Sequence, residues 1–436
     1  MQKKQNNIGL VWFRNDLRVQ DNAVLQKAIA DCESIIACYC FDPRHYEMTK
    51  YGFKKTERFR AQFIIESVHE LRKNLKELNV ELFVFHEYPE VVLEKLTAIY
   101  SVKNIYLQNE WTSEEINVLD KVKNNLPAHI AYHEIYDQFL FHPEDIPMAI
   151  SEIPQVFTVF RKKVEKYRAV RPSITVATTN AILEIENHTT IPDLSDLGLS
   201  NFEAIPDSAF PFKGGESQAL ERLNDYFFKT KKLGVYKKTR NGLIGKDFSS
   251  KFSPWLANGC ISARTIYHQV KRFERDFFKN QSTYWLIFEL IWRDYFKYVS
   301  LKHENAIFKI GGILHKDYEW KSDERLINSW INGETRSNFV NANMIELKKT
   351  GWMSNRGRQN VGSFLAKDLF VDWRIGAAYF EAMLIDYDVH SNYGNWMYVA
   401  GVGNDPRDRK FNVDLQAERY DANGKFQRMW LQETLF

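Results

Sequence analysis

The first third of the chain alternates short apolar runs with amphipathic ones. Five runs have the length and composition of buried strands, at residues 9–13, 35–41, 82–85, 105–107 and 130–133. Helical patterns lie between them, at residues 22–30, 54–78, 89–100 and 113–126. Thr112 and Glu115 predict a capping box at the start of the last helix. Because strands that alternate with helices indicate a parallel sheet, we predict a doubly wound, five-stranded α/β domain in residues 1–135.

The turn after the first strand reads Arg-Asn-Asp-Leu-Arg, at residues 14–18. It has no Gly-x-Gly-x-x-Gly pattern, which disfavours a dinucleotide bound there in the way usual for such sheets. We therefore expect Asp16 and Arg18 to brace the loop rather than to contact a ligand.

The rest of the chain has a different pattern. A chain of 436 residues is too long for one compact core, so two domains are expected. Residues 136–207 are rich in proline and polar residues, and we interpret them as a linker with one helix, at 155–170. Beyond residue 216 only helical patterns remain, at 218–230, 262–273, 283–301 and 324–331. We predict an all-α domain in residues 208–436.

Composition gives no sign of a metal-binding, secreted or membrane-spanning protein. The net charge of +3 is small, so whole-chain charge does not by itself indicate nucleic-acid binding. The 4 cysteines have no accompanying set of metal ligands, which indicates free thiols and no metal site. No signal peptide, transit sequence or long apolar run is visible. These features predict a cytoplasmic protein without a membrane partner, and we expect a monomer.

Residues 351–398 are the most informative stretch. Val361, Phe364, Leu365 and Leu369 have the spacing of a buried helical face. Paired arginines, paired aspartates and three tryptophans surround this face, at 356, 358, 386, 388, 352, 373 and 396. A large planar cofactor with polar edges would use such a set. The alternative is a core helix whose charges form ordinary surface ion pairs.

A second stretch is rich in hydroxyl groups. Residues 249–253 read Ser-Ser-Lys-Phe-Ser, and Pro254 and a helical run follow. Hydroxyl and backbone N–H groups at such a helix start can bind a phosphate. The alternative is an ordinary serine-rich N-cap.

Five motifs occur in the order seen in the photolyase/cryptochrome family, which this chain resembles over nearly its whole length. They lie at residues 12–18, 249–253, 289–293, 351–356 and 386–396. Three further features look most like the DASH-type cryptochromes: residues 41–44, residues 288–296, and the pair Gln359 and Tyr398.

The resemblance implies one non-covalent FAD, folded into a U inside the helical domain. The positions that match its phosphate-binding residues are Tyr236, Ser249, Ser250, Lys251, Phe252 and Ser253. Those around the isoalloxazine ring are Arg293, Arg358, Asp386 and Asp388, and further contacts are expected from Trp285, Glu289 and Trp292. Arg358 and Asp386 are expected to form a buried ion pair, which gives positional specificity more reliably than stability.

Asn392 matches the position that faces flavin N5. A neutral amide does not repel the anionic reduced flavin, whereas a carboxylate would, so we expect the fully reduced state to be accessible. Trp396, Trp373 and Trp320 match the electron-transfer tryptophans, in order from flavin to surface. The implied catalytic residues are therefore Glu289, Asn392 and these three tryptophans.

The resemblance also implies a site for a cyclobutane pyrimidine dimer flipped out of its strand. The matching positions are Arg240, Glu289, Trp292, Asn355, Arg356, Gln359 and Tyr398. Trp292 would supply a flat wall, Arg240 and Arg356 would hold phosphates, and Glu289 would contact the carbonyl edge. Asn355 and Gln359 stand where enzymes of (6-4) photoproducts have histidines, which disfavours that chemistry.

Glu110 matches a carboxylate that contacts methenyltetrahydrofolate, so the resemblance implies a folate antenna rather than a deazaflavin. A solvent-facing loop glutamate is the alternative, and Phe308 stands where some folate-binding members have lysine. The expected function is light-driven repair of cyclobutane pyrimidine dimers, preferentially in single-stranded DNA, as a deoxyribodipyrimidine photo-lyase. RNA is left open as a further partner.

Two other functions are alternatives on the same residues. One is a blue-light receptor that binds nucleic acid without efficient repair. The chain ends at Phe436 without the long tail of many signalling cryptochromes, which favours the enzyme. The other is a flavin-free nucleic-acid-binding protein, which would be colourless.

Overall fold

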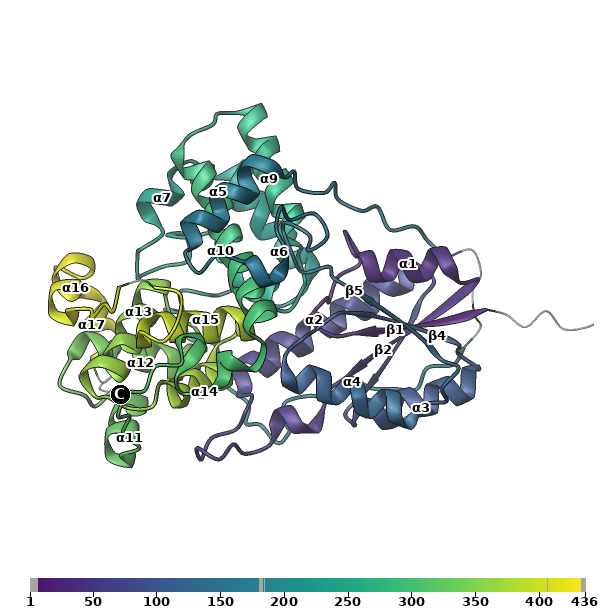
Figure 1. Ribbon diagram of the computed structural model, residues 1–436, viewed down its shortest axis with the longest axis horizontal. Coiled ribbons are helices and arrows are strands. Elements are labelled where there is room, and N and C mark those ends of the chain that lie inside the picture. The colour runs from purple at the N-terminus through teal and green to yellow at the C-terminus, as the bar shows by residue number, and fades with distance from the viewer. Residues whose placement is uncertain (1–6, 180–182, 184, 406, 433–436) are drawn as a thin grey trace, which may run out of the picture.

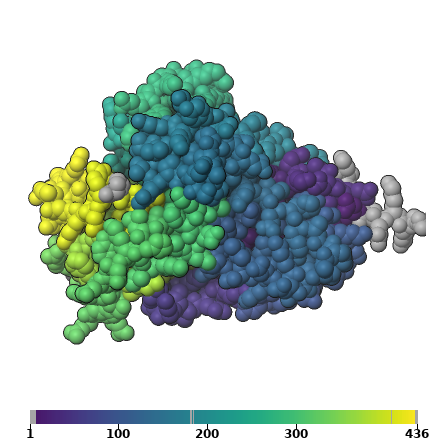
Figure 2. Space-filling model, in the orientation of Figure 1, coloured from purple at the N-terminus to yellow at the C-terminus, as the bar shows by residue number. Residues whose placement is uncertain are grey.

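The chain forms a sheet-containing N-terminal part and a helical C-terminal part, which lie side by side in the computed structural model (Figure 1). The structure describes residues 7–179, 183, 185–405 and 407–432, so the chain end at Phe436 lies outside it. Figure 2 shows that the atoms of the two parts are in direct contact on the face in view.

The sheet has five parallel strands in the order β3-β2-β1-β4-β5. Their bounds are β1 Ile8–Phe13, β2 Ser34–Cys40, β3 Glu81–Phe85, β4 Asn104–Gln108 and β5 Ala131–Ile135. Every predicted strand bound lies within two residues of the observed one. The strand order runs outward in both directions from β1, so the predicted doubly wound topology is confirmed.

Alternate residues of β1 face different helices. Val11 and Phe13 belong to a core shared with α1 (Ala23–Asp31) and α2 (Arg58–Glu77). Leu10 and Trp12 belong to a second core shared with α3 (Pro89–Tyr100) and α4 (Ser113–Asn125). The sheet is therefore buried on both faces, as the two-residue period of a strand requires.

Two local predictions are wrong. Thr112 is the N-cap residue of α4, but its side chain accepts no hydrogen bond from the helix backbone. Its hydroxyl contacts the Glu115 carboxyl instead, so the two side chains satisfy each other and no capping box forms. The helix expected from residue 54 begins at Arg58, because Lys54 pairs with Met48 in an isolated antiparallel bridge.

Within the described residues of segment 136–207 there is one α-helix, α5 (Phe157–Tyr167), which is shorter than predicted. Its buried residues Phe157 and Phe160 pack on Tyr295 of α10 (Gln281–His303). Figure 1 shows α5 among the helices of the C-terminal part. This helix therefore contributes to the helical core, although the chain around it is irregular.

The C-terminal part is helical throughout its described residues. Besides α10, its longer helices are α6 (Glu216–Asn224), α9 (Ala263–Asp276), α11 (Glu324–Asn332), α12 (Asn338–Thr350), α13 (Asn355–Ser363), α14 (Trp373–Met383), α15 (Val389–Ala400) and α16 (Val413–Tyr420). Shorter ones are α7 (Tyr236–Thr239), α8 (Ser253–Ala257) and α17 (Lys425–Leu431). The helix predicted through 361–369 is α13 followed by a π-helical turn, Phe364–Asp368, a feature that often marks functional regions.

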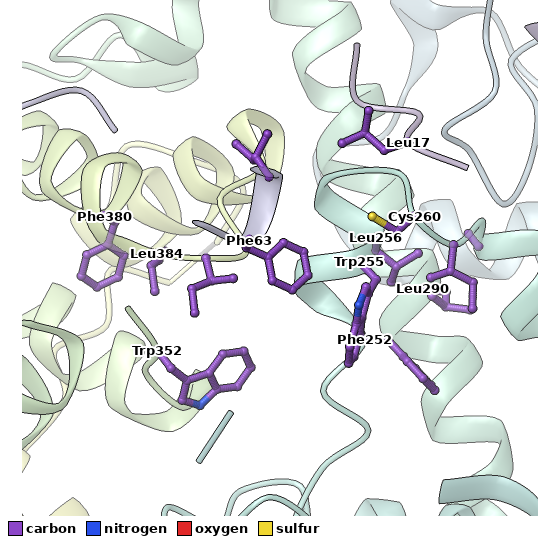
Figure 3. Packing of buried hydrophobic residues seen from close by; sticks show 14 of the residues in the cluster. Leu17, Phe63, Phe252, Trp255, Leu256, Cys260, Leu290, Trp352, Phe380 and Leu384 are labelled. Carbon is purple, nitrogen blue, oxygen red and sulfur yellow. The ribbon is translucent and has the colours of Figure 1, made fainter. Parts of the chain in front are cut away.

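One continuous core joins the two parts. Phe63 of α2 lies 6.1 Å from the ring of Trp255 in α8, measured between ring centroids. Figure 3 shows Phe63 between Trp255 on one side and Leu384 on the other. Trp352, which the sequence placed near a cofactor, belongs to this core and stacks on Phe210 at 5.1 Å.

The loop after β1 is braced by charges, as predicted. Asp16 accepts a hydrogen bond from the backbone N–H of Arg14 at 2.8 Å. The Arg18 guanidinium is ion-paired with Asp137 and donates to the Gly259 carbonyl at 3.0 Å. This loop therefore ties the sheet to the helical part.

Among the described residues, no helix is both long and apolar enough to cross a bilayer. The same residues contain no group of three or more Cys, His, Asp or Glu that could hold a metal ion. The four cysteines are free thiols.

Candidate functional site

A cavity of about 280 Å³ lies within the helical part, between α10, α13, α14 and α15. Eleven of the predicted site residues line it: Arg240, Glu289, Trp292, Asn355, Arg358, Gln359, Asp386, Asp388, Asn392, Trp396 and Tyr398. This set includes predicted cofactor residues and predicted substrate residues. The fold therefore brings together side chains that are more than 150 residues apart in the sequence.

The predicted ion pair between Arg358 and Asp386 is present. One guanidinium nitrogen of Arg358 lies 2.9 Å from both carboxylate oxygens, and Asp386 is buried. Arg358 also donates through Nε to the Met353 carbonyl at 3.0 Å. These bonds fix the guanidinium at the cavity wall, where it is available to a polar ligand.

Asp388 has a partner that the sequence analysis missed. Lys297 of α10 lies 2.9 Å from it; Lys297 is buried, and the Asp388 side chain is 12% exposed. Burial alone would raise the pKa of Asp388, but Lys297, His390 and Arg293 together lower it below its usual range. The sequence places Lys297 one helical turn after Arg293, on the same face of the helix, but does not show that Asp388 lies opposite that face.

Asn392 is held in one orientation. Its amide nitrogen donates to the Ala377 carbonyl at 3.0 Å, and the side chain lines the cavity. The amide oxygen has no hydrogen-bond partner among the described residues, so it remains free to accept a hydrogen bond from a ligand.

The loop 249–253 lies outside this cavity, at the start of α8. Ser250 and Lys251 are buried, and the φ of Lys251 is +65°. The Lys251 ammonium lies 4.5 Å from the ring of Trp352 and has no hydrogen-bond acceptor among the described residues. Burial lowers the pKa of Lys251 well below its usual value. An anionic group would give this ammonium a partner, and the phosphate contact of the loop stays a prediction.

Three further predicted cofactor residues also lie outside this cavity: Tyr236, Trp285 and Arg293. Tyr236 is buried at the start of α7, and Trp285 stands under the Lys237 ammonium, 4.3 Å from it. Arg293 donates to the carbonyls of Gln138 and Leu256, at 2.5 and 3.1 Å. Their roles toward a cofactor stay predictions.

The three predicted electron-transfer tryptophans differ in their surroundings. Trp396 lines the cavity, Trp373 is fully buried, and Trp320 is half-buried. A bridge between Lys321 and Val371 places the segment of Trp320 beside the start of α14, where Trp373 stands. The order of electron transfer through these tryptophans stays a prediction.

A fourth tryptophan contacts Trp396 and was missed. Trp330 of α11 is fully buried, and its ring centroid lies 6.1 Å from that of Trp396, nearly edge to face. Its indole N–H donates to the Val361 carbonyl at 3.0 Å. Its place on a predicted helix was visible in the sequence, but its contact with Trp396 depends on how α11 packs.

The residues predicted to bind a substrate also meet at this cavity. Arg240 forms an ion pair with Glu289 at 2.7 Å. One face of Trp292 is covered by Phe157, whose ring stacks on it at 3.6 Å. Phe157 was missed, because its segment had been assigned to a linker. Tyr398 approaches Trp292 edge to face, with ring centroids 6.4 Å apart.

Arg356 does not line the cavity. It donates to Gln359 at 2.9 Å and to Asn241 at 3.2 Å, and it lies over the ring of Tyr420. It therefore stands beside the cavity residues Asn355 and Gln359, on the rim.

A second cavity, of about 530 Å³, lies between the α/β part and the helical part. Glu110, Phe308, Arg293 and Asp388 are among its lining residues. Glu110 is buried and accepts a hydrogen bond from Gln108 at 2.8 Å, so it is not a solvent-facing loop residue. Asp388 lines both cavities, so it lies in the wall between them.

The chain was compared with known proteins. Residues 285–435 match the family model described as the FAD binding domain of DNA photolyase, and residues 9–177 match the DNA photolyase model. "Cryptochrome DASH" of Gloeobacter violaceus is 46% identical over 97% of this chain and 85% of that protein. The protein of the same name from Xenopus laevis is 48% identical over 97% of this chain and 82% of that protein.

The chain belongs to the DASH cryptochromes of the photolyase/cryptochrome family. The fold agrees: the crystal structure of the Synechocystis cryptochrome superposes with a TM-score of 0.92 at 44% identity, over 99% of this chain and 89% of that one. An archaeal photolyase from Sulfolobus tokodaii, described with two FAD molecules, gives a TM-score of 0.80 at 27% identity, over 98% and 90%.

The helical part of this DASH cryptochrome is therefore an FAD-binding domain. The residues present fit that cofactor. The Lys251 ammonium has no hydrogen-bond acceptor among the described residues, and the Asn392 amide and the Arg358 guanidinium line the cavity beside their protein partners. A phosphate, a ring N–H and a ring carbonyl would satisfy them in turn.

The purified protein is expected to be yellow and to contain one FAD per chain. Arg358→Ala should lose most of its FAD, because it leaves Asp386 as an unpaired buried charge, a change that costs about 3–5 kcal/mol. Flavin absorbance after gel filtration measures this, and Arg325→Ala, at an exposed arginine of α11, is the control. A colourless wild type that takes up no FAD would contradict the prediction.

Proposed function

We propose that this protein is a light-driven, FAD-dependent lyase that splits cyclobutane pyrimidine dimers, preferentially in single-stranded DNA. One observation carries the proposal. The same cavity is lined by Arg358, Asp386 and Asn392 on one side and by Glu289, Trp292 and Tyr398 on the other. A flipped dimer in this cavity would lie next to the cofactor.

FAD, when bound, supplies an electron from its excited reduced state and takes it back after the ring has opened. The other contributions come from the protein. Trp292 gives the dimer a flat apolar wall, and Phe157 behind it keeps that wall in place. Asn392 offers an amide without charge, so an anionic cofactor is not repelled.

The electrostatics of the cavity favour the same chemistry. Burial raises the pKa of the Glu289 carboxyl above its usual value, although Arg240 opposes the shift. A carboxyl that holds its proton can donate a hydrogen bond to a pyrimidine carbonyl. Such a bond strengthens when the base acquires negative charge, so it stabilises the reduced dimer more than the intact one.

The test is illumination of the reduced protein with oligonucleotides that contain one dimer, followed by counting of restored pyrimidines. Release of pyrimidines only in the light, and only with FAD bound, supports the proposal. Binding of the strand without restoration would favour the alternative, a blue-light receptor.

An RNA oligonucleotide with the same dimer shows whether RNA is a substrate, and gel filtration checks the expected monomer.

We propose further that the cavity of about 530 Å³ holds methenyltetrahydrofolate as an antenna. Glu110 and Gln108 present buried acceptors there, and the Gln108 carbonyl has no partner among the described residues. The amino and N–H groups of a pterin would satisfy them. A second flavin is the competing ligand, because the archaeal photolyase named above is described with two FAD molecules.

Glu110→Ala is expected to lose bound folate and its near-ultraviolet absorbance, while the FAD content stays the same. The loss of one charge-assisted bond of about 1.5–3 kcal/mol corresponds to roughly tenfold to hundredfold weaker binding. Absorbance of the reconstituted proteins measures this, with Glu94→Ala on the exposed face of α3 as the control. Equal folate content in Glu110→Ala and the wild type would show that the antenna site is elsewhere.

A further inference from the structure

Arg240 and Glu289 face each other across the mouth of the smaller cavity. Arg240 follows α7 directly and Glu289 lies in the middle of α10, and their charged atoms are 2.7 Å apart. The side chains are 21% and 30% exposed, so solvent still reaches the pair. In the protein without a strand, this arginine therefore lowers the pKa of Glu289, against the larger effect of burial.

In the part of the chain that the structure describes, Glu289 forms no ion pair with another cation. Tyr236 of α7 is buried beside Glu289 and keeps its proton, because burial raises its pKa above the usual range. Lys237 is engaged with Gln281 and the ring of Trp285. The charged groups on the other elements around α10 have partners of their own: Arg161 with Glu165, Arg356 with Gln359, Arg358 with Asp386, and Lys297 with Asp388.

The same arginine is a predicted phosphate contact, and it cannot neutralise two anions at once. A phosphate that binds Arg240 removes or neutralises the positive charge that lowers the pKa of Glu289. A dimer that enters the cavity also excludes water from the carboxylate, which increases the cost of its charge. Both effects favour the protonated carboxyl.

We propose that Arg240 couples strand binding to protonation of Glu289. When the phosphate of a strand binds Arg240, Glu289 takes up one proton from solvent and donates it as a hydrogen bond to the pyrimidine carbonyl. On release the proton returns to solvent and the ion pair forms again. No covalent bond changes, and the inference rests on the proposed function because it needs a dimer in this cavity.

The coupling has a definite pH dependence. The pKa of Glu289 lies above its usual value in the free protein and would lie higher still in the complex. Between these two pKa values each complex formed takes up a proton, so the affinity falls as pH rises, by up to about tenfold per unit. At lower pH Glu289 is already protonated in the free protein, and the uptake disappears.

The experiment measures proton uptake in the dark. The FAD-loaded protein is titrated with a single-stranded oligonucleotide that contains one thymine dimer, by calorimetry in two buffers of different ionisation enthalpy. We expect uptake approaching one proton for the wild type and none for Glu289→Gln. Arg240→Gln should bind more weakly and take up less, because its Glu289 has no cation in the free protein.

Two controls isolate the coupling. Lys237→Gln removes a cation of α7 that does not contact Glu289, so its proton uptake should equal that of the wild type. The dimer as a dinucleotide, without flanking phosphates, leaves Arg240 on Glu289 and should bind with little uptake. Zero uptake in the wild type, or unchanged uptake in Glu289→Gln, would overturn the inference. Neither result touches the proposed repair, which the illumination assay tests separately.

Discussion

Trp396→Phe is expected to keep its FAD and to lose photoreduction in the presence of an external reductant. Of the three predicted electron-transfer tryptophans, Trp396 is the one that lines the cavity of about 280 Å³, and it is 3% exposed. Phenylalanine fills a similar space but is much harder to oxidise than an indole, so the first electron donor is lost. We expect photoreduction at least about tenfold slower, which corresponds to about 1.4 kcal/mol of activation free energy.

The measurement is the decay of the oxidised flavin band under steady blue light. Trp430→Phe is the matched control, because this tryptophan is equally buried but packs with Phe339 and Phe426, away from the cavity. Unchanged photoreduction in Trp396→Phe would show that electrons enter by another route.

Trp330 makes the result more informative. Because it contacts Trp396 directly, an electron could reach Trp396 from α11 as well as from Trp373. Trp373→Phe that abolishes photoreduction would support the predicted order of Trp396, Trp373 and Trp320. A slow residual rate that disappears in the double variant with Trp330→Phe would reveal a second branch.

The sequence predicted the sheet well, because buried parallel strands are short apolar runs whose signal is local. Val11 and Leu10 show the reason: both faces of β1 are covered, so the run is apolar without interruption. The predicted capping box between Thr112 and Glu115 does not form, and the cause cannot be read from the spacing of the two residues. Burial and the neighbouring Glu110 raise the pKa of Glu115 to about 7, and its carboxyl turns to the threonine hydroxyl.

The cavity residues were predicted from ordered motifs, and eleven of them line one cavity. Apart from the ion pair between Arg358 and Asp386, the motifs did not give the partners of these side chains. Lys297, Trp330 and Phe157 contact Asp388, Trp396 and Trp292 only because separate helices pack against one another. Such contacts depend on tertiary packing, which a linear spacing does not encode.

Repair is expected to be efficient for dimers in single-stranded DNA and poor in a fully paired duplex. Tyr398 and Gln359 line the substrate side of the cavity, where duplex-repairing photolyases commonly have tryptophan and methionine. A phenol offers less stacking area than an indole, and an amide is more polar than a thioether. Gln359 is also held by Arg356 at 2.9 Å, which turns a polar group toward the rim. We therefore expect this cavity to bind a flipped dimer less tightly than a cavity with tryptophan and methionine at these two positions.

Flipping a dimer out of a duplex costs a few kcal/mol of stacking and pairing, and least when the strand is already single. Every 1.4 kcal/mol of this cost that the cavity does not offset lowers duplex repair about tenfold. Steady-state repair of one sequence as single strand, paired duplex and duplex with the dimer in an unpaired loop measures the effect. The salt concentration must be the same throughout, because phosphate contacts are strongly salt-dependent.

The looped duplex separates the flipping cost from the electrostatic effect of a second strand. It has the same phosphates as the paired duplex, yet its dimer is already unpaired. We expect it to be repaired nearly as fast as the single strand, and Tyr398→Trp should raise repair of the paired duplex more than repair of the loop. Equal rates on all three substrates would refute the single-strand preference while leaving the repair chemistry intact. Slow repair of the loop and the duplex alike would place the discrimination in the second strand's phosphates instead of the cavity.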